Sequence, residues 1–170
     1  SLIDEGIGKM LSALESTGTL DDTLIIFTSD HGDALGDHGM PFKGFFYDCM
    51  SRVPLIVKGP GISAARSSSL VSTLDLVPLF YNSCEAAAPA TLQGEDIRPL
   101  FADPTATIRE HAFCEIEGRM MVRSATHKYA HYSDGSSELY DLTTDPDEIT
   151  NLADNPDYAR IESDLKTKLV

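Results

Sequence analysis

The feature that most constrains the fold is the run Thr23-Leu-Ile-Ile-Phe-Thr28, which is almost entirely apolar and rich in β-branched residues. A short run of this kind favours a strand buried on both faces, as in a parallel sheet covered by helices. Just before it, residues 2–17 place five apolar side chains on one helical face: Ile3, Ile7, Met10, Leu11 and Leu14. A helix followed by a buried strand is half of a βαβ unit, so this chain is expected to start inside a fold.

A second buried strand is predicted at Val53-Pro-Leu-Ile-Val57, after a long polar loop over residues 29–51. A helix is expected to begin at Asp75, with Pro78 in its first turn, where a missing N–H costs little. Residues 84–107 are expected to be irregular. Together these features predict an α/β fold over residues 1–108, as part of a mostly parallel sheet flanked by helices.

The pattern changes after residue 108. Short strand-like runs separated by turn residues predict an antiparallel meander: Ala112–Glu117, Arg119–Ser124, His127–Tyr132 and Glu138–Leu142. A final helix is predicted over about residues 156–169, where apolar side chains recur with helical spacing. Residues 109–170 are therefore expected to form a small antiparallel four-stranded subdomain with a C-terminal helix.

The net charge of −14 argues against nonspecific binding to nucleic acid or to an anionic membrane. No apolar run approaches the roughly 18 residues that a membrane-spanning helix needs. No signal-peptide pattern opens the chain. The three cysteines, Cys49, Cys84 and Cys114, are odd in number and widely spaced, so free thiols are expected rather than a disulfide framework.

The tetrapeptide Ser29-Asp30-His31-Gly32 follows the first predicted strand directly, at the end where open α/β sheets bind ligands. Asp30 offers hard oxygens for a divalent cation, and His31 offers a nitrogen or a proton. By itself the tetrapeptide is equally compatible with an ordinary polar turn, because Asp and Gly are common in turns.

Two more residues of the same loop are candidates. Lys43 can bind the oxygens of a tetrahedral anion as a point charge, although a lone lysine is more often a solvated surface residue. His38 is a candidate acid–base group, and the alternative is a loop histidine bonded to a carbonyl.

Taken in order, these segments resemble the C-terminal signature of the type I sulfatases, which belong to the alkaline phosphatase superfamily. The resemblance is carried first by residues 28–39, by Lys43-Gly44 and by residues 52–61. Further along, residues 72–78 are similar to the family's connecting helix. The segment from Glu138 to Leu152 is similar to its C-terminal subdomain, so the resemblance covers almost the whole chain.

The resemblance implies a role for each candidate. Asp30 and His31 match positions that complete a divalent metal site, which most often holds calcium, and Lys43 matches the lysine that contacts the sulfate oxygens. His38 falls within the family pattern and is kept as a catalytic candidate. Many members have asparagine where His31 stands, and histidine is a softer ligand, so manganese and zinc stay open. The implied substrate is a small-molecule or saccharide sulfate ester.

The resemblance also implies residues that this sequence does not contain. In the family, a Cys or Ser within Cys/Ser-x-Pro-x-Arg is converted to the formylglycine nucleophile, and this motif and a pair of metal-binding aspartates are expected upstream. Cys49-Met-Ser-Arg52 lacks the proline and the spacing, so Cys49 is expected to be a packing residue. Hydrolysis of sulfate esters is therefore expected of a longer parent protein, and the 170 residues alone are expected to be inactive.

Alternatives stay open at this point. A phosphodiesterase or phosphonate monoester hydrolase of the same superfamily would share the Asp-His and Lys elements and differ in substrate. A non-catalytic, truncated metal-binding or interaction fragment is the alternative outside the enzymes. Because a parallel sheet that lacks its central strands has exposed edges, a covering partner is also expected, either in a homo-oligomer or as the missing N-terminal part.

Overall fold

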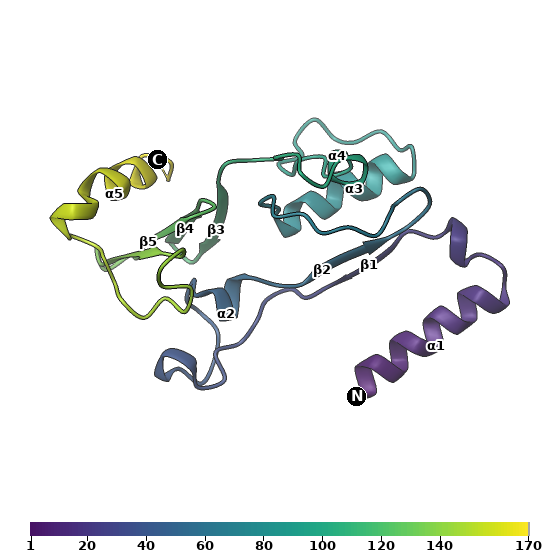
Figure 1. The fold of residues 1–170 in the computed structure, drawn as a ribbon, viewed down its shortest axis with the longest axis horizontal. Coiled ribbons are helices and arrows are strands. Elements are labelled where there is room, and N and C mark those ends of the chain that lie inside the picture. The colour runs from purple at the N-terminus through teal and green to yellow at the C-terminus, as the bar shows by residue number, and fades with distance from the viewer. Residues whose placement is uncertain (170) are drawn as a thin grey trace.

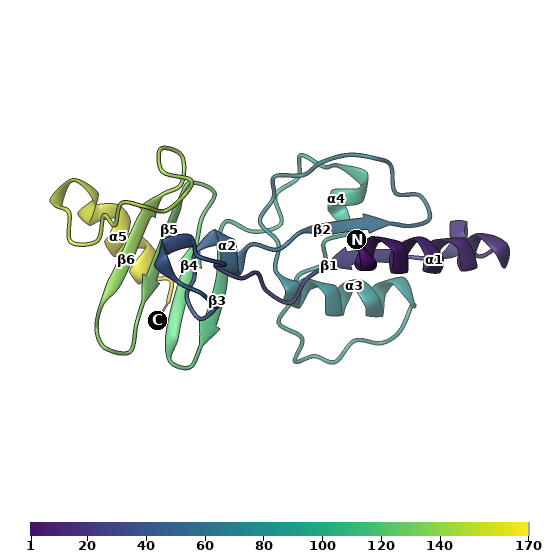
Figure 2. The ribbon, with the colours of Figure 1, turned by 90° about the horizontal axis from the view of Figure 1, so that it is seen from below.

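The computed structural model describes residues 1–169, which form two parts joined by extended segments (Figures 1 and 2). The first part contains α1 (Leu2–Ser16), β1 (Ile25–Thr28), β2 (Leu55–Lys58), α3 (Leu76–Ser83) and α4 (Pro99–Ala102). The short helix α2 (Asp48–Ser51) lies between β1 and β2 in sequence and contacts the second part through Asp48. The second contains β3 (Ala112–Ile116), β4 (Arg119–Arg123), β5 (His127–His131), β6 (Ser137–Asp141) and α5 (Ala159–Lys166). No helix in this described range is both long and apolar enough to cross a membrane.

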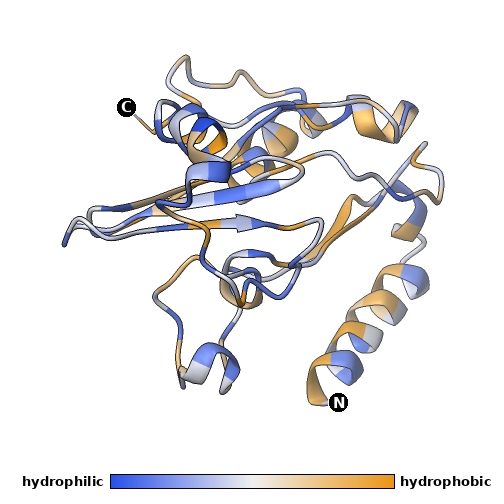
Figure 3. Cartoon of the chain, turned by 60° about the vertical axis from the view of Figure 1, so that its left-hand side comes forward, coloured by the Kyte–Doolittle hydropathy of each residue, from blue (hydrophilic) through white to orange (hydrophobic). Residues whose placement is uncertain are grey.

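Helix α1 confirms the first predicted helix. The side chain of Ser1 accepts a hydrogen bond from the Asp4 amide at its N-terminus, and Asp4 and Glu5 in the first turn suit the helix dipole. The helix buries none of its residues and projects away from the chain in Figure 1. Figure 3 shows hydrophobic stretches, in orange, along this helix. Ile3 and Met10 are 72% and 62% exposed.

The predicted parallel sheet is wrong for this chain. Strands β1 and β2 form a two-stranded antiparallel sheet, with Ile25 opposite Lys58 and Thr28 opposite Leu55. Parallel neighbours need a long crossover connection, usually a helix. Between β1 and β2 the longest helix is the four-residue α2, so the chain reverses direction and returns beside itself.

The residue before α3, Asp75, does not act as a simple helix cap. The fully buried Asp75 accepts hydrogen bonds from the amides of Ser72 (2.7 Å) and Glu95 (2.8 Å) and from the Arg109 guanidinium. Its side chain therefore secures the turn before α3 instead of capping the first amides of that helix. Pro78 does lie in the first turn, as predicted, where its missing N–H leaves no bond unmade.

The antiparallel meander is confirmed. The sheet has the order β3-β4-β5-β6, and each strand pairs with its neighbour in sequence through short turns. Because side chains alternate between the faces of a strand, the sheet has two apolar faces. One contacts Phe46 through Met121, Ala130 and Tyr132. The other packs Val122, Tyr129 and Leu139 against Leu165 of α5.

Candidate functional site

The loop after β1 is held against the backbone of α2 at one glycine. The Gly32 amide donates to the Met50 carbonyl at 2.8 Å. A Cβ added at Gly32 would lie 2.0 Å from the Cys49 carbonyl oxygen, so only glycine permits this approach. The contact fixes the turn that carries Asp30 and His31 out of β1.

Asp30, His31 and Lys43 converge although twelve residues separate His31 from Lys43. The Lys43 Nζ contacts His31 Nε2, and Asp30 Oδ2 lies 3.3 Å from the same ring nitrogen. The His31 amide also donates to Asp30 Oδ1 at 2.9 Å. Two potential metal donors and one cation therefore meet at a single place at the loop surface.

The contacts of His31 define which ring nitrogen carries the lone pair that a metal ligand needs. Its Nδ1 lies 2.8 Å from the carbonyl oxygen of Gly32, which can only accept a hydrogen bond. Nδ1 therefore carries the proton, and the lone pair of the neutral ring is on Nε2, which faces Asp30 and Lys43. Metal-binding histidines are commonly oriented in this way by a backbone carbonyl.

Asp30 remains ionised under most conditions. The hydrogen bond from the His31 amide lowers the pKa of its carboxyl group below the ordinary value of 3.8. The side chain is 82% exposed, so its oxygens are open to a ligand from outside.

The donor set fits part of a metal site. Asp30 supplies carboxylate oxygens, and His31 supplies an oriented nitrogen. Over residues 1–169, no group of three or more His, Cys, Asp or Glu side chains is placed to hold a metal ion. Because calcium takes six to eight oxygen ligands, these two residues can provide only one side of such a site.

His38 does not join this group in the part of the chain that the structure describes. Its ring stacks on Tyr47 with 3.7 Å between the ring centroids and an interplanar angle of 10°. It also lines a small acidic pocket with Asp37, Asp48 and Glu148. His38 has φ of 53°, an uncommon backbone conformation for a residue with a side chain. Its catalytic role stays a prediction, and its observed contacts are with an aromatic ring.

A buried charge network, which was not predicted from the sequence, links the loop to the C-terminal sheet. Lys128 on β5 is 1% exposed and lies 2.6 Å from Glu148, which is 2% exposed. Its Nζ also donates to the carboxylate of Asp48 and to the carbonyl of Phe46, at 2.9 Å in the second case. Arg123 forms an ion pair with the same Asp48 carboxylate. Buried charges persist only when they are paired in this way.

The sequence did contain one signal for this network. Within the predicted strand His127–Tyr132, Lys128 has the same parity as Ala130 and Tyr132, so all three must share a face. A lysine on the apolar face of a strand demands a buried carboxylate partner. Which carboxylate it was could not be read from the sequence, because Asp48 and Glu148 are 80 and 20 residues away.

An aromatic cluster borders the network. Glu138 accepts hydrogen bonds from the hydroxyls of Tyr47 (3.0 Å) and Tyr132 (2.7 Å). Burial raises the pKa of the Tyr132 hydroxyl, and the hydrogen bond to Glu138 raises it further. These tyrosines are therefore neutral hydrogen-bond donors that fix Glu138 beneath the loop.

The network makes a pH-dependent contribution to stability. Burial raises the pKa of Asp48, but attraction to Lys128 and hydrogen bonds from Lys128 and Arg123 outweigh burial and lower it below 3.8. A carboxylate with a lowered pKa stabilises the fold fully above its unfolded pKa, and this stabilisation fades as the pH falls through its folded pKa.

We expect Asp48→Asn to flatten the loss of stability below about pH 4, as followed by urea unfolding. The matched control is Asp164→Asn, at a position on α5 whose side chain is 72% exposed. An acid slope in Asp48→Asn as steep as that of the unchanged protein would contradict this.

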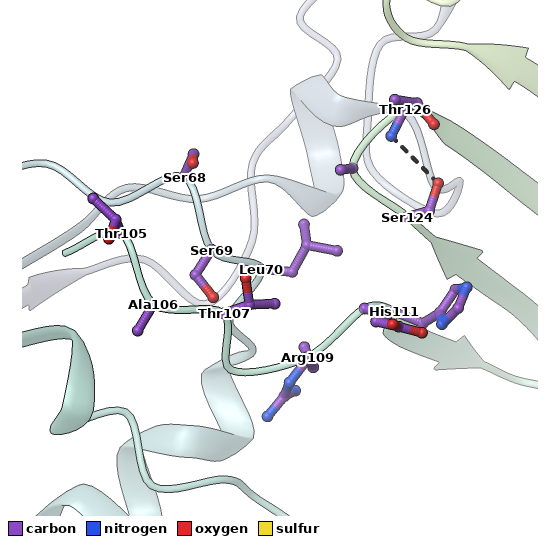
Figure 4. A pocket seen from close by; sticks show the side chains of 12 residues that line it. Ser68, Ser69, Leu70, Thr105, Ala106, Thr107, Arg109, His111, Ser124 and Thr126 are labelled. Carbon is purple, nitrogen blue, oxygen red and sulfur yellow. Dashed lines mark hydrogen bonds between the residues drawn. The ribbon is translucent and has the colours of Figure 1, made fainter. Parts of the chain in front are cut away.

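A second pocket, of about 400 Å³, lies away from these residues (Figure 4). It is lined by Ser68–Leu70, Thr105–Thr107, Arg109–His111 and Ser124–Thr126. The Arg109 guanidinium binds the buried Asp75, and Ser69 accepts from the Ile108 amide at 2.9 Å. These polar groups thus form hydrogen bonds at the junction between the two parts. None of the predicted site residues lines this pocket.

Comparison with known proteins places the chain in a family context. The family described as N-sulphoglucosamine sulphohydrolase, C-terminal, matches residues 36–170. A choline-sulfatase from Rhizobium meliloti is 37% identical over 164 residues, which cover 92% of this chain and 32% of the relative. An N-acetylglucosamine-6-O-sulfatase from Bacteroides thetaiotaomicron is 31% identical over 179 residues, which cover 96% of this chain and 32% of the relative. The chain thus spans about a third of the length of these relatives.

The fold is similar to solved structures of the same superfamily. The crystal structure of the phosphonate monoester hydrolase of Agrobacterium radiobacter aligns with a TM-score of 0.84 and 31% sequence identity. The alignment covers 98% of this chain and 38% of that protein. This chain and that hydrolase therefore share their fold over nearly the whole of the 170 residues.

Proposed function

Because the chain belongs to the sulfatase family, as its C-terminal part, we propose that it supplies the metal-and-anion half of a sulfatase active site. The observation that carries the proposal is the convergence of Asp30 Oδ2, His31 Nε2 and Lys43 Nζ at one place in the loop after β1. The formylglycine nucleophile and the other metal ligands would come from polypeptide outside these 170 residues.

In this proposal each residue of the chain has one task. Asp30 and His31 hold a divalent cation, with calcium as the first candidate and manganese or zinc as alternatives, because a nitrogen ligand suits the softer ions. The cation, when bound, stabilises negative charge on the sulfuryl oxygens. Lys43 contacts the same oxygens with its ammonium group. The Gly32 carbonyl keeps the His31 proton on Nδ1, so that the lone pair lies on Nε2, the atom that Lys43 Nζ contacts.

The substrate is proposed to be a sulfate ester of a small molecule or a saccharide, as the names of the aligned choline and N-acetylglucosamine sulfatases suggest. The second candidate is a phosphonate monoester, which the likeness to the Agrobacterium radiobacter hydrolase supports. Both esters present tetrahedral anions to the same half-site.

The proposal is tested by steady-state hydrolysis of paired aryl sulfate and aryl phosphonate esters by the full-length protein. We expect the sulfate ester to be preferred, and Lys43→Ala to lower kcat/KM by about 100-fold, as is typical when one group that stabilises transition-state charge is removed. The exposed Lys9→Ala on α1 is the matched control. Preference for the phosphonate would favour the second candidate. Turnover of either ester by residues 1–170 alone would contradict the proposed division of the site.

A further inference from the structure

Three cations of the C-terminal sheet hold the segment that follows Lys43. Arg119 on β4 donates to the Gly44 carbonyl at 2.7 Å, and Lys128 on β5 donates to the Phe46 carbonyl at 2.9 Å. Arg123, at the other end of β4, pairs with Asp48. The contacts therefore fall on every second residue from Gly44 to Asp48. In Figure 2, α2 and the loop before it lie against this sheet.

The alternation of the strands explains why these three side chains act together. Arg119, Met121 and Arg123 have the same parity on β4, and Met121 packs on Phe46. The sheet thus presents one face to the loop, with an apolar centre and a cation at each end of β4.

Arg119 contacts the residue next to Lys43, which is a glycine and so has few steric limits on its backbone. Gly44 has φ of 133°, a region that glycine enters at little cost and leaves as easily. The hydrogen bond from Arg119 fixes this permissive position. The guanidinium also lies over the Phe45 ring, 5.7 Å from its centroid, which holds the arginine in place.

We infer that Arg119 is a positioning residue for Lys43. It fixes the Gly44 peptide and thereby directs the lysine ammonium toward His31 and the anion. The inference rests on the proposed function of Lys43 and adds a residue 75 positions from Gly44 to the same site. Arg119 touches a neutral carbonyl rather than a buried charge, so its removal leaves no unpaired ion.

The first test is a double-mutant cycle in the full-length protein, with hydrolysis of an aryl sulfate as the readout. Arg119→Ala is expected to lower kcat/KM by roughly 10-fold to 100-fold, mostly through kcat, because small misplacements of a charge-stabilising group have effects of this size. Arg119→Lys keeps one donor and is expected to recover most of the loss. In a Lys43→Ala background, Arg119→Ala is expected to have no further effect on the residual rate. Arg160→Ala, at a 95% exposed position on α5, is the matched control.

The outcomes separate the two proposals. Equal fold losses from Arg119→Ala with and without Lys43 would overturn the positioning role and leave the function of Lys43 intact. An unchanged rate in Lys43→Ala would overturn the proposed function, and the positioning role with it.

A second readout needs no catalysis. Loss of one hydrogen bond should speed amide hydrogen exchange over residues 43–48 by roughly fivefold to tenfold in Arg119→Ala. Arg160→Ala should leave it unchanged. Unaltered exchange over this segment in Arg119→Ala would overturn the inference even if the variant were inactive.

Discussion

Replacing Lys128 by methionine is expected to destabilise the protein by about 3–5 kcal/mol, the usual effect of removing one partner from a buried ion pair. Methionine has nearly the length and volume of lysine, so the change tests the charge and creates little cavity. It leaves Glu148, which is 2% exposed, without its cation. Asp48 keeps Arg123, so Glu148 is the group left unpaired.

The measurement is the free energy of unfolding from urea denaturation, with Lys9→Met as the control. Lys9 is exposed and forms an ordinary pair with Glu5 on α1, so its loss is expected to change stability by about 0.5 kcal/mol or less. Adding Glu148→Gln to Lys128→Met is expected to recover part of the stability, because the unpaired charge is then gone. If Lys128→Met proves as stable as the unchanged protein, Lys128 is not the group that compensates these carboxylates.

The second large effect is expected from Gly32→Ala, which should destabilise the protein by about 3 kcal/mol through overpacking. The new Cβ would meet the Cys49 carbonyl oxygen at 2.0 Å and the Cys49 carbonyl carbon at 3.0 Å. Both are backbone atoms, which cannot rotate away as a side chain would. The loop must then move off α2, and Asp30 and His31 move with it.

Gly6→Ala is the matched control for this substitution. A Cβ at Gly6 on α1 meets nothing within 4 Å, and alanine favours a helix by up to about 1 kcal/mol over glycine. Thermal unfolding of the two variants should therefore move in opposite directions. A Gly32→Ala variant with an unchanged melting temperature would show that the contact with Cys49 relaxes without cost.

Local structure was largely predictable from the sequence. Helix α1, both apolar strands and the four-stranded meander were predicted, because their patterns of apolar residues follow the helical or strand period over short distances. The mostly parallel sheet that the sequence predicted is not present in this chain, where β1 and β2 pair antiparallel. An apolar strand favours burial of both its faces. Its sequence does not show whether the neighbouring strand runs parallel or antiparallel to it. The boundary at residue 108 stays a prediction.

The candidate site was predictable in part. Asp30 and His31 follow a strand end, and the resemblance to sulfatases added Lys43; the structure brings the three side chains together. Their roles as metal and anion ligands remain proposals. The same reasoning made His38 a catalytic candidate. In the structure its ring stacks on Tyr47, and its catalytic role stays a prediction.

The sequence by itself determined where this chain forms helices and strands, which loop carries the polar candidates, and which family it resembles. Only the tertiary structure decided what holds that loop in place. Arg119, Arg123 and Lys128 donate to Gly44, Asp48 and Phe46, respectively, across 75 to 82 residues of sequence. Such contacts have no local period to mark them, because they depend on how two separately folded segments meet. The sheet that the sequence predicted as a separate subdomain thus contacts the segment that follows Lys43.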